Sequence, residues 1–412
     1  MPMRWWLGLA MAASIAAQTL AGSAAQAPRA AGPGPTEASA QHSAGAITRF
    51  GFDLFARIRQ TPGNACLSPL SVAEALAIAH AGAAGATAGQ MAATLHLGSD
   101  APAGFAALRH ALAPRDSVYE LTIANGLWLD ASAEFDPQYL EQARRSYDAQ
   151  LARVAFSDPP RACDTINAWV AAATRGHIPE IVSPGAVTPA TRLVITNAVY
   201  FRGRWEHPFD RAGTSDEDFV SRPGTTRAVP FMHLTRSWRY TENDRVQVLE
   251  LPYQGDRLRM LVILPRTVAG REDVERGLNV ERVSQWVGAL QERSVEVHLP
   301  RFRVESDYAL EHDLSAMGMP DAFDPRRADF SGMDDRHDLF VGAVLHRTFV
   351  DVEETGTTAA AATAGVMEVS ALIRPSAPPP VVFRADHPFL FLIRDADTGV
   401  VLFLGRCEQP KG

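Results

Sequence analysis

The segment from residue 353 to residue 383, EETGTTAAAATAGVMEVSALIRPSAPPPVVF, constrains the fold of this chain more than any other stretch. Nothing large or charged stands between Gly356 and Gly365. Composition alone favours an alanine-rich linker or a helix, because alanine has a high helix propensity. Small side chains would equally let an exposed loop enter a crowded sheet, where alternate residues of a strand pack on buried surface. The segment therefore has two placements open to it, and the surrounding motifs decide between them.

Composition and charge exclude several classes of function. The chain has 412 residues, of which 46% are hydrophobic and 21% charged, which is typical of a globular protein with ample material for a core. The formal net charge is −8 and arginines do not cluster with aromatic residues, so nucleic acid is not expected as a partner. Lys411 is the only lysine, which excludes Schiff-base catalysis and a phosphate-loop lysine.

Residues 1–27 are typical of a secretory signal peptide. Arg4 precedes an apolar, alanine-rich run from Trp5 to Leu20, and small residues follow it. The alternative is an uncleaved membrane anchor. Residues 28–44 show no periodicity and are expected to be a disordered linker. The sequence thus predicts a secreted or periplasmic protein without membrane contact after cleavage, although the cleavage site stays open.

The cysteines are three and scattered: Cys66, Cys163 and Cys407. This set is neither a disulfide framework nor a metal-ligand pattern. An oxidising compartment would allow one disulfide, and the sequence leaves open which two cysteines, if any, would pair. No metal or cofactor site is predicted.

Hydrophobic periodicity places helices mainly in the first half and strands mainly in the second. Helical patterns cover residues 45–60, 71–81 (with Ser71 as cap), 87–95, 136–148, 163–175 and 308–317. Strand patterns cover residues 121–129 and 193–202 and dominate from residue 246 onward, ending in a hairpin. This order indicates one α+β domain over residues 45–410, without repeats or an internal linker.

Short motifs in a fixed order make the chain resemble a serpin over roughly residues 45–408. They include Asn64 with Leu67–Ser71, Asn197–Trp205, Leu299–Phe302, Asp386–Phe391 and Phe403–Arg406. The resemblance implies a fold of three β-sheets and about nine helices, with an exposed reactive-centre loop at about residues 354–382. It also implies a monomer that acts as an irreversible suicide-substrate inhibitor of extracellular serine proteases. The cut loop would insert into the central sheet, and the protease would remain as a covalent acyl complex.

The resemblance assigns a hinge at the start of the loop. Its residues are Glu354, Gly356, Thr357, Thr358, Ala359, Ala360, Ala361 and Ala362. Thr357 would be the first to insert, and since it is neither proline nor charged it supports an inhibitory role. Arg301 would pair with Glu354, and Trp205 would pack beneath them. In serpins this region at the top of the central sheet is called the breach. The alternative is two unrelated surface charges, which contribute little.

A second cluster that the resemblance implies is the shutter, formed by Ser68, Ser71, Asn197 and His346 under the sheet. Serine and histidine together also suggest a catalytic triad. However, Ser68 precedes Pro69 and no Gly-x-Ser-x-Gly turn exists, so no catalytic residue is assigned and the protein is not expected to be an enzyme.

The position of the cleaved bond follows from the spacing that the resemblance implies. It selects Ser370 and Ala371, which suit elastase-like or subtilisin-like proteases. Leu372 and Ile373 are alternatives for a chymotrypsin-like protease, and Arg374, which precedes proline, is a third. A non-inhibitory serpin that binds or carries another molecule is the alternative function, and a secreted hydrolase is a remote one.

Overall fold

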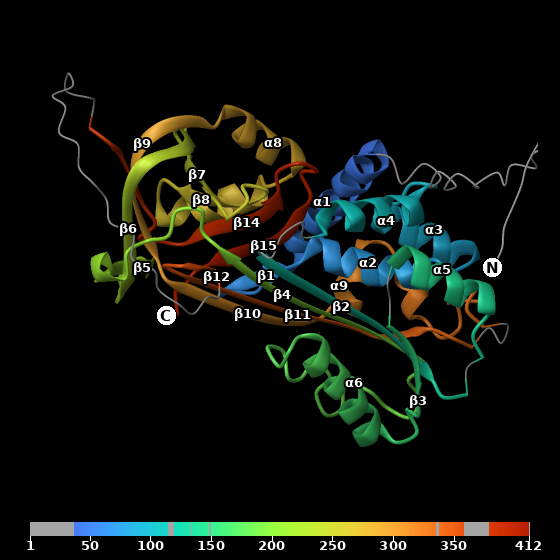
Figure 1. The fold of residues 1–412 in the computed structure, drawn as a ribbon. Coiled ribbons are helices and arrows are strands. Elements are labelled where there is room, and N and C mark those ends of the chain that lie inside the picture. The colour runs from blue at the N-terminus through green and yellow to red at the C-terminus, as the bar shows by residue number, and fades with distance from the viewer. Residues whose placement is uncertain are drawn as a thin grey trace, which may run out of the picture. The chain divides into compact units, whose positions relative to one another are not determined.

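Two β-sheets organise the residues that the computed structural model describes, namely 37–113, 119–132, 134–147, 150–334, 338–357 and 379–411 (Figure 1). All of them lie in one compact unit, residues 35–412. The mixture of helices and sheets is the expected α+β class. The segment assigned to a signal peptide lies outside the described residues. Within the described part, no helix is long and apolar enough to cross a membrane.

The six-stranded sheet is central because helices cover both of its faces. In spatial order its strands are β10 (Phe302–Ala309), β11 (Val341–Glu353), β12 (Gly356–Thr357), β4 (Leu193–Arg204), β2 (Tyr119–Asp130) and β3 (Gln150–Val154). Val194 and Ala198 of β4 join a hydrophobic cluster with α6 (Pro159–Ala173). Ile195 and Val199 belong to the main core, together with residues of α2 (Pro69–His80). Helices α2 and α6 lie on opposite faces of the sheet (Figure 1). Alternate residues of one strand thus fill two cores, which is why β4 reads as a continuous apolar run.

The second sheet has nine strands. They are β1 (Ala65–Leu67), β15 (Val401–Cys407), β14 (Phe389–Asp395), β8 (Leu258–Pro265), β7 (Val246–Pro252), β6 (Thr225–Glu242), β9 (Gln291–Pro300) and β13 (Val381–Arg384), with β5 (Ser215–Arg222) beside β6. Three sheets were expected, but the described strands join into two. The reason is the long β6, which pairs with β5 near its start and with β7 near its end, so the hydrogen-bonded ladder is continuous.

Nine α-helices lie in the described part of the chain. Besides α2 and α6 they are α1 (Glu37–Ile58), α3 (Gly85–Thr94), α4 (Ala101–Leu112), α5 (Pro137–Tyr147), α7 (Arg271–Arg276), α8 (Val280–Ala289) and α9 (Glu311–Met317). The cap of α2 is Ser68 rather than Ser71, since the Ser68 hydroxyl accepts from the Ser71 N–H and Pro69 occupies the first turn.

Two further expectations about element boundaries were wrong. The linker expected over residues 28–44 is helical from Glu37 onward, because Ala40, Ala44 and Ile47 recur at helical spacing and are buried. The helix expected from Tyr308 begins only at Glu311, because Tyr308 still pairs with β11 as a strand residue. In both cases tertiary packing decided the boundary.

The three cysteines do not pair with one another. Cys66, Cys163 and Cys407 are all buried free thiols. Burial raises the pKa of Cys66 to about 12, so this thiol is protonated and unreactive at neutral pH.

Candidate functional site

At one end of the six-stranded sheet, strands β11 and β4 separate, and Gly356 and Thr357 lie in the gap between them. Along most of their length β11 and β4 pair directly and in parallel, from Val341 opposite Leu193 to Phe349 opposite Tyr200. Beyond that point the chain turns back, and β12 lies between them, antiparallel to both. Gly356 and Thr357 therefore form a short strand between β11 and β4.

Gly356 makes the turn into this gap sterically feasible. Its φ of 146° lies in a region that residues with a side chain rarely adopt. A Cβ at this position would collide with the main-chain carbonyl of Gly203 on β4. Any side chain here would therefore push β12 away from β4.

Glu354 anchors the turn that connects β11 to β12. Its carboxylate is fully buried and accepts hydrogen bonds from Arg301, at 2.7 Å from Nε, and from the Thr214 hydroxyl at 2.6 Å. Its main-chain carbonyl accepts from the Phe209 N–H at 2.9 Å. Burial acts to raise the pKa of Glu354, but the hydrogen bonds from Arg301 and Thr214 outweigh it and hold the pKa below its ordinary value. The group is therefore an anion held by one arginine, with Arg211 at 3.8 Å as a second, more exposed cation.

Thr357 is buried against aromatic rings. Its side chain is fully enclosed, and its hydroxyl lies 2.8 Å from the Tyr253 hydroxyl. The Tyr253 ring stacks on Trp205 at 4.5 Å between centroids. The Trp205 indole in turn donates to the Glu353 carbonyl at 3.0 Å. Thr357 is thus enclosed beside the stacked rings of Tyr253 and Trp205.

Below the opening, a row of polar side chains crosses the closed part of the sheet. His346 of β11 lies opposite Asn197 of β4, which lies opposite Asn125 of β2. Asn197 accepts from the His346 ring and donates to Asn125 and to the Ser71 hydroxyl. The His346 ring also accepts from the Ser68 N–H at 3.0 Å. The four residues assigned to the shutter are therefore brought together, and Asn125 extends their row.

The same contacts weigh against a nucleophile–base pair. Burial lowers the pKa of His346 to about 3, partly offset by its hydrogen bond with Asn197, so the ring is neutral at pH 7. It contacts the main chain of Ser68, while the Ser68 hydroxyl caps α2. A Ser–His catalytic pair needs the ring nitrogen to face the hydroxyl, and this ring faces an amide.

Several predicted residues lie outside the described part of the chain. They are the later hinge residues Thr358, Ala359, Ala360, Ala361 and Ala362, and the reactive-bond candidates Ser370, Ala371, Leu372, Ile373 and Arg374. The reactive bond therefore remains a prediction from sequence.

Three residues of the site were missed by the sequence reasoning. Asn125 is the one amide side chain in the mostly apolar stretch LTIANGLWL, and this contrast was a usable signal. Nothing in the local sequence around Thr214 or Tyr253 indicates contact with the hinge. Their roles depend on chain segments far apart in the sequence.

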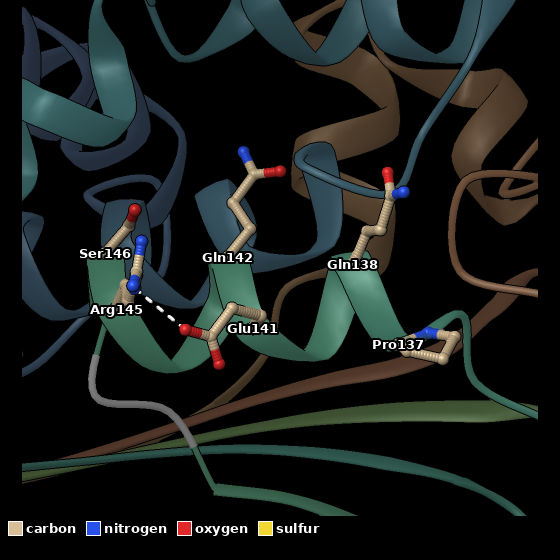
Figure 2. A pocket seen from close by; sticks show the side chains of 6 residues that line it. All are labelled: Pro137, Gln138, Glu141, Gln142, Arg145 and Ser146. Atoms are coloured by element: carbon tan, nitrogen blue, oxygen red, sulfur yellow. Dashed lines mark ion pairs between the residues drawn. The ribbon is translucent and has the colours of Figure 1, made fainter.

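A separate surface hollow on α5 does not resemble a functional site. Its lining comes from one helix face and includes the exposed ion pair between Glu141 and Arg145 at 2.8 Å (Figure 2). Exposed pairs of this kind contribute little. The hinge and the polar row therefore remain the candidate site.

Comparisons with known proteins agree with this geometry. The family model described as Serpin (serine protease inhibitor) matches residues 45–410. An uncharacterized serpin-like protein of Thermococcus kodakarensis is 40% identical over 372 residues, covering 89% of this chain and 85% of that protein. The leukocyte elastase inhibitor of Homo sapiens is 37% identical over 378 residues, covering 89% and 98%. The crystal structure of human thyroxine-binding globulin superposes with a TM-score of 0.82 at 26% identity, covering 91% of this chain and 100% of that one.

Proposed function

The chain belongs to the serpin family, and from that premise we propose that it inhibits its target protease irreversibly, as a suicide substrate whose cut loop inserts between β11 and β4. The observation that carries this proposal is the place of β12, which already separates these two strands at one end. Serpin loop insertion is a known instance of β-strand addition. Further residues of the loop would continue the same strand down the sheet.

The energetics favour insertion once the loop is cut. The single parallel ladder between β11 and β4 would be replaced by two antiparallel ladders, one on each side of the new strand. Thr358 and the alanines that follow carry no charge and little bulk, so they can enter the sheet without the desolvation of a charged group. The uncut loop is held back because it is tethered at both ends, and the folded state is therefore a kinetic trap.

Insertion requires the polar row to open. His346 and Asn197 are direct partners across the β11–β4 ladder, so a strand passing between them must break their hydrogen bond. Ser68 and Ser71, at the start of α2, contact the two strands separately: the Ser68 N–H donates to His346 of β11, and the Ser71 hydroxyl accepts from Asn197 of β4. Each separated group can therefore keep a polar partner. We propose that this row is the lock that keeps the sheet closed before cleavage.

The proposed target is an extracellular serine protease of elastase-like or subtilisin-like specificity. The small residues Ser370 and Ala371 support this choice, and the name of the leukocyte elastase inhibitor relative agrees with it. A chymotrypsin-like target, cut at Leu372 or Ile373, is the alternative. Export is proposed from residues 1–27, whose composition is that of a signal peptide, and a monomer is proposed from the family resemblance.

A carrier role is the second candidate. It is favoured by the likeness to thyroxine-binding globulin, whose structure was determined as a complex with thyroxine. The hinge argues for inhibition instead, since Thr357 and the residues after it are small and uncharged.

Incubation of the purified protein with elastase, subtilisin and chymotrypsin tests the proposal. A denaturing gel should show a protease-sized increase in mass that survives boiling, and the mass of the released C-terminal peptide should identify the cut bond. If all three enzymes cut the loop and are released active, the inhibitory proposal is wrong. A carrier role would then be the stronger interpretation.

A further inference from the structure

Two histidines and a glutamate converge where four strands of the nine-stranded sheet meet. His233 of β6 and His298 of β9 are direct cross-strand partners, with ring centroids 4.5 Å apart. Glu217 of β5 places its Oε1 2.8 Å from His233 Nε2 and 3.6 Å from His298 Nδ1. One donor atom from each of the three residues lies within 4.8 Å of the other two. No element of the hinge contributes to this cluster.

We propose that Glu217, His233 and His298 form a binding site for a divalent transition-metal ion such as Zn²⁺. Imidazole nitrogen and carboxylate oxygen are ligands that Zn²⁺ prefers, and three protein ligands leave a fourth position for water. Bond lengths of about 2.1 Å in a tetrahedral site put donor atoms about 3.4 Å apart. The separations of 2.8 and 3.6 Å lie on either side of that value, so small rotations of the side chains suffice.

His298 has the carboxylate partner that often orients a metal-binding histidine. Its other ring nitrogen, Nε2, lies 3.1 Å from Oε1 of Glu296. A carboxylate in this position fixes the ring orientation and increases the basicity of the nitrogen that faces the ion. Glu296 lies on the same strand as His298, two residues before it. Side chains two residues apart in a strand point to the same face, which places the carboxylate beside the ring.

Arg384 of β13 is the group that an ion would displace. Its guanidinium forms an ion pair with Oε2 of Glu217 and lies 3.5 Å from Nδ1 of His298. Oε2 is buried and, among the described residues, makes no hydrogen bond apart from this ion pair. The Arg384 side chain is 40% exposed and sits on an edge strand of four residues, so it can turn toward solvent. Glu217 and the two histidines would then face the ion without a competing cation.

The competing interpretation is that these residues form a surface ion-pair network that binds no metal. Replacement of Arg384 distinguishes the two interpretations. If Arg384 only stabilises Glu217, its removal costs stability and leaves metal affinity low. If it competes with an ion for Glu217, Arg384→Gln should bind Zn²⁺ more tightly than the parent, by roughly tenfold, which is the low end of what outer-shell groups contribute.

The test uses the full chain after treatment with a chelator, titrated with Zn²⁺ in a calorimeter and with Co²⁺ in a spectrophotometer. The parent should bind one Zn²⁺ per chain, and the Co²⁺ spectrum should show nitrogen and oxygen coordination. Glu217→Gln and His298→Gln should each weaken Zn²⁺ binding by at least about tenfold. Circular dichroism checks the fold, and His233→Gln replaces either variant that fails to fold.

His96 provides a matched control. Its Nε2 lies 2.7 Å from Asp53, and no described residue adds a third metal-binding donor to this histidine–carboxylate pair. Its φ of 54° suits asparagine, so His96→Asn should fold and bind Zn²⁺ as the parent does. Absence of binding to the parent, or equal affinity in the parent and the Glu217 and His298 variants, would overturn the proposal. Unchanged affinity in Arg384→Gln would overturn the competition by Arg384. None of these outcomes depends on whether the chain inhibits a protease.

Discussion

Replacement of Thr357 by arginine should turn the protein from an inhibitor into a substrate. The Thr357 side chain is fully enclosed, and its hydroxyl bonds the Tyr253 hydroxyl at 2.8 Å. An arginine inserted there would bury a charge without a partner, which costs about 3–5 kcal/mol. It would also leave the Tyr253 hydroxyl unpaired, at about 1–3 kcal/mol. The lower ends of these ranges together give a penalty of about 4 kcal/mol on the inserted state.

The penalty should act mainly after cleavage. In the uncut protein the described part of β12 is Gly356 and Thr357, and we expect the variant to release these two residues from the gap and still fold. Once the loop is cut, however, insertion must begin at Thr357. A barrier higher by about 4 kcal/mol slows insertion roughly a thousandfold, while hydrolysis of the acyl bond keeps its normal rate. Hydrolysis then wins, and the protease leaves active.

The assay is the number of inhibitor molecules consumed per protease inactivated, measured by residual activity and by denaturing gel. Thr357→Val keeps the branched shape without charge and should still inhibit. Thr226→Arg, at an exposed position of β6, controls for added charge and should behave as the parent. Equal stoichiometry in Thr357→Arg and the parent would refute the hinge assignment.

Three further results are expected. Protein cut in the loop should unfold at a higher temperature than uncut protein in calorimetry, since the inserted strand adds a ladder on each side; equal midpoints would contradict insertion. Folding lowers the pKa of His346 from 6.5 to about 3, so the unfolded state binds the proton first and stability falls as the pH drops below 6.5, by up to about 1.4 kcal/mol per unit. Urea midpoints at pH 7 and pH 5 should therefore differ less in His346→Asn than in the parent, and an identical pH dependence would argue against this role. Arg301→Ala should destabilise the protein by about 2–3 kcal/mol, below the range for a fully buried pair because Arg301 is 33% exposed. The matched control is Arg303→Ala, which breaks an exposed ion pair with Glu305 and should destabilise the protein by less than about 1 kcal/mol. If thermal unfolding shows similar losses of stability for Arg301→Ala and Arg303→Ala, the burial of Glu354 contributes nothing.

Hydrophobic periodicity located several helices well. It failed where a residue pairs with a strand that is distant in the sequence. The helix expected over residues 136–148 is α5, Pro137–Tyr147, because its apolar positions follow one face. Tyr308 was assigned to a helix on the same kind of evidence. Its pairing with His346 of β11 keeps it in a strand, and periodicity within a short window contains no information about that partner.

The candidate site divides in a similar way. The ion pair between Arg301 and Glu354 was expected from motifs, and the structure contains it. Thr214 and Tyr253, which complete the environment of the hinge, were not expected. Each lies on a segment whose position relative to the hinge is set by sheet register, and register is a property of pairs of strands.

By itself, the sequence determined which parts of the chain could carry the function. The absence of bulk and charge after Gly356 is a local property, and so is the order of motifs that identifies the family. Only the tertiary structure decided that β12 lies between β11 and β4, and that His233 and His298 face each other beside Glu217. These contacts join residues far apart in the chain, and they exist because hydrogen-bonded strands fix which side chains become neighbours.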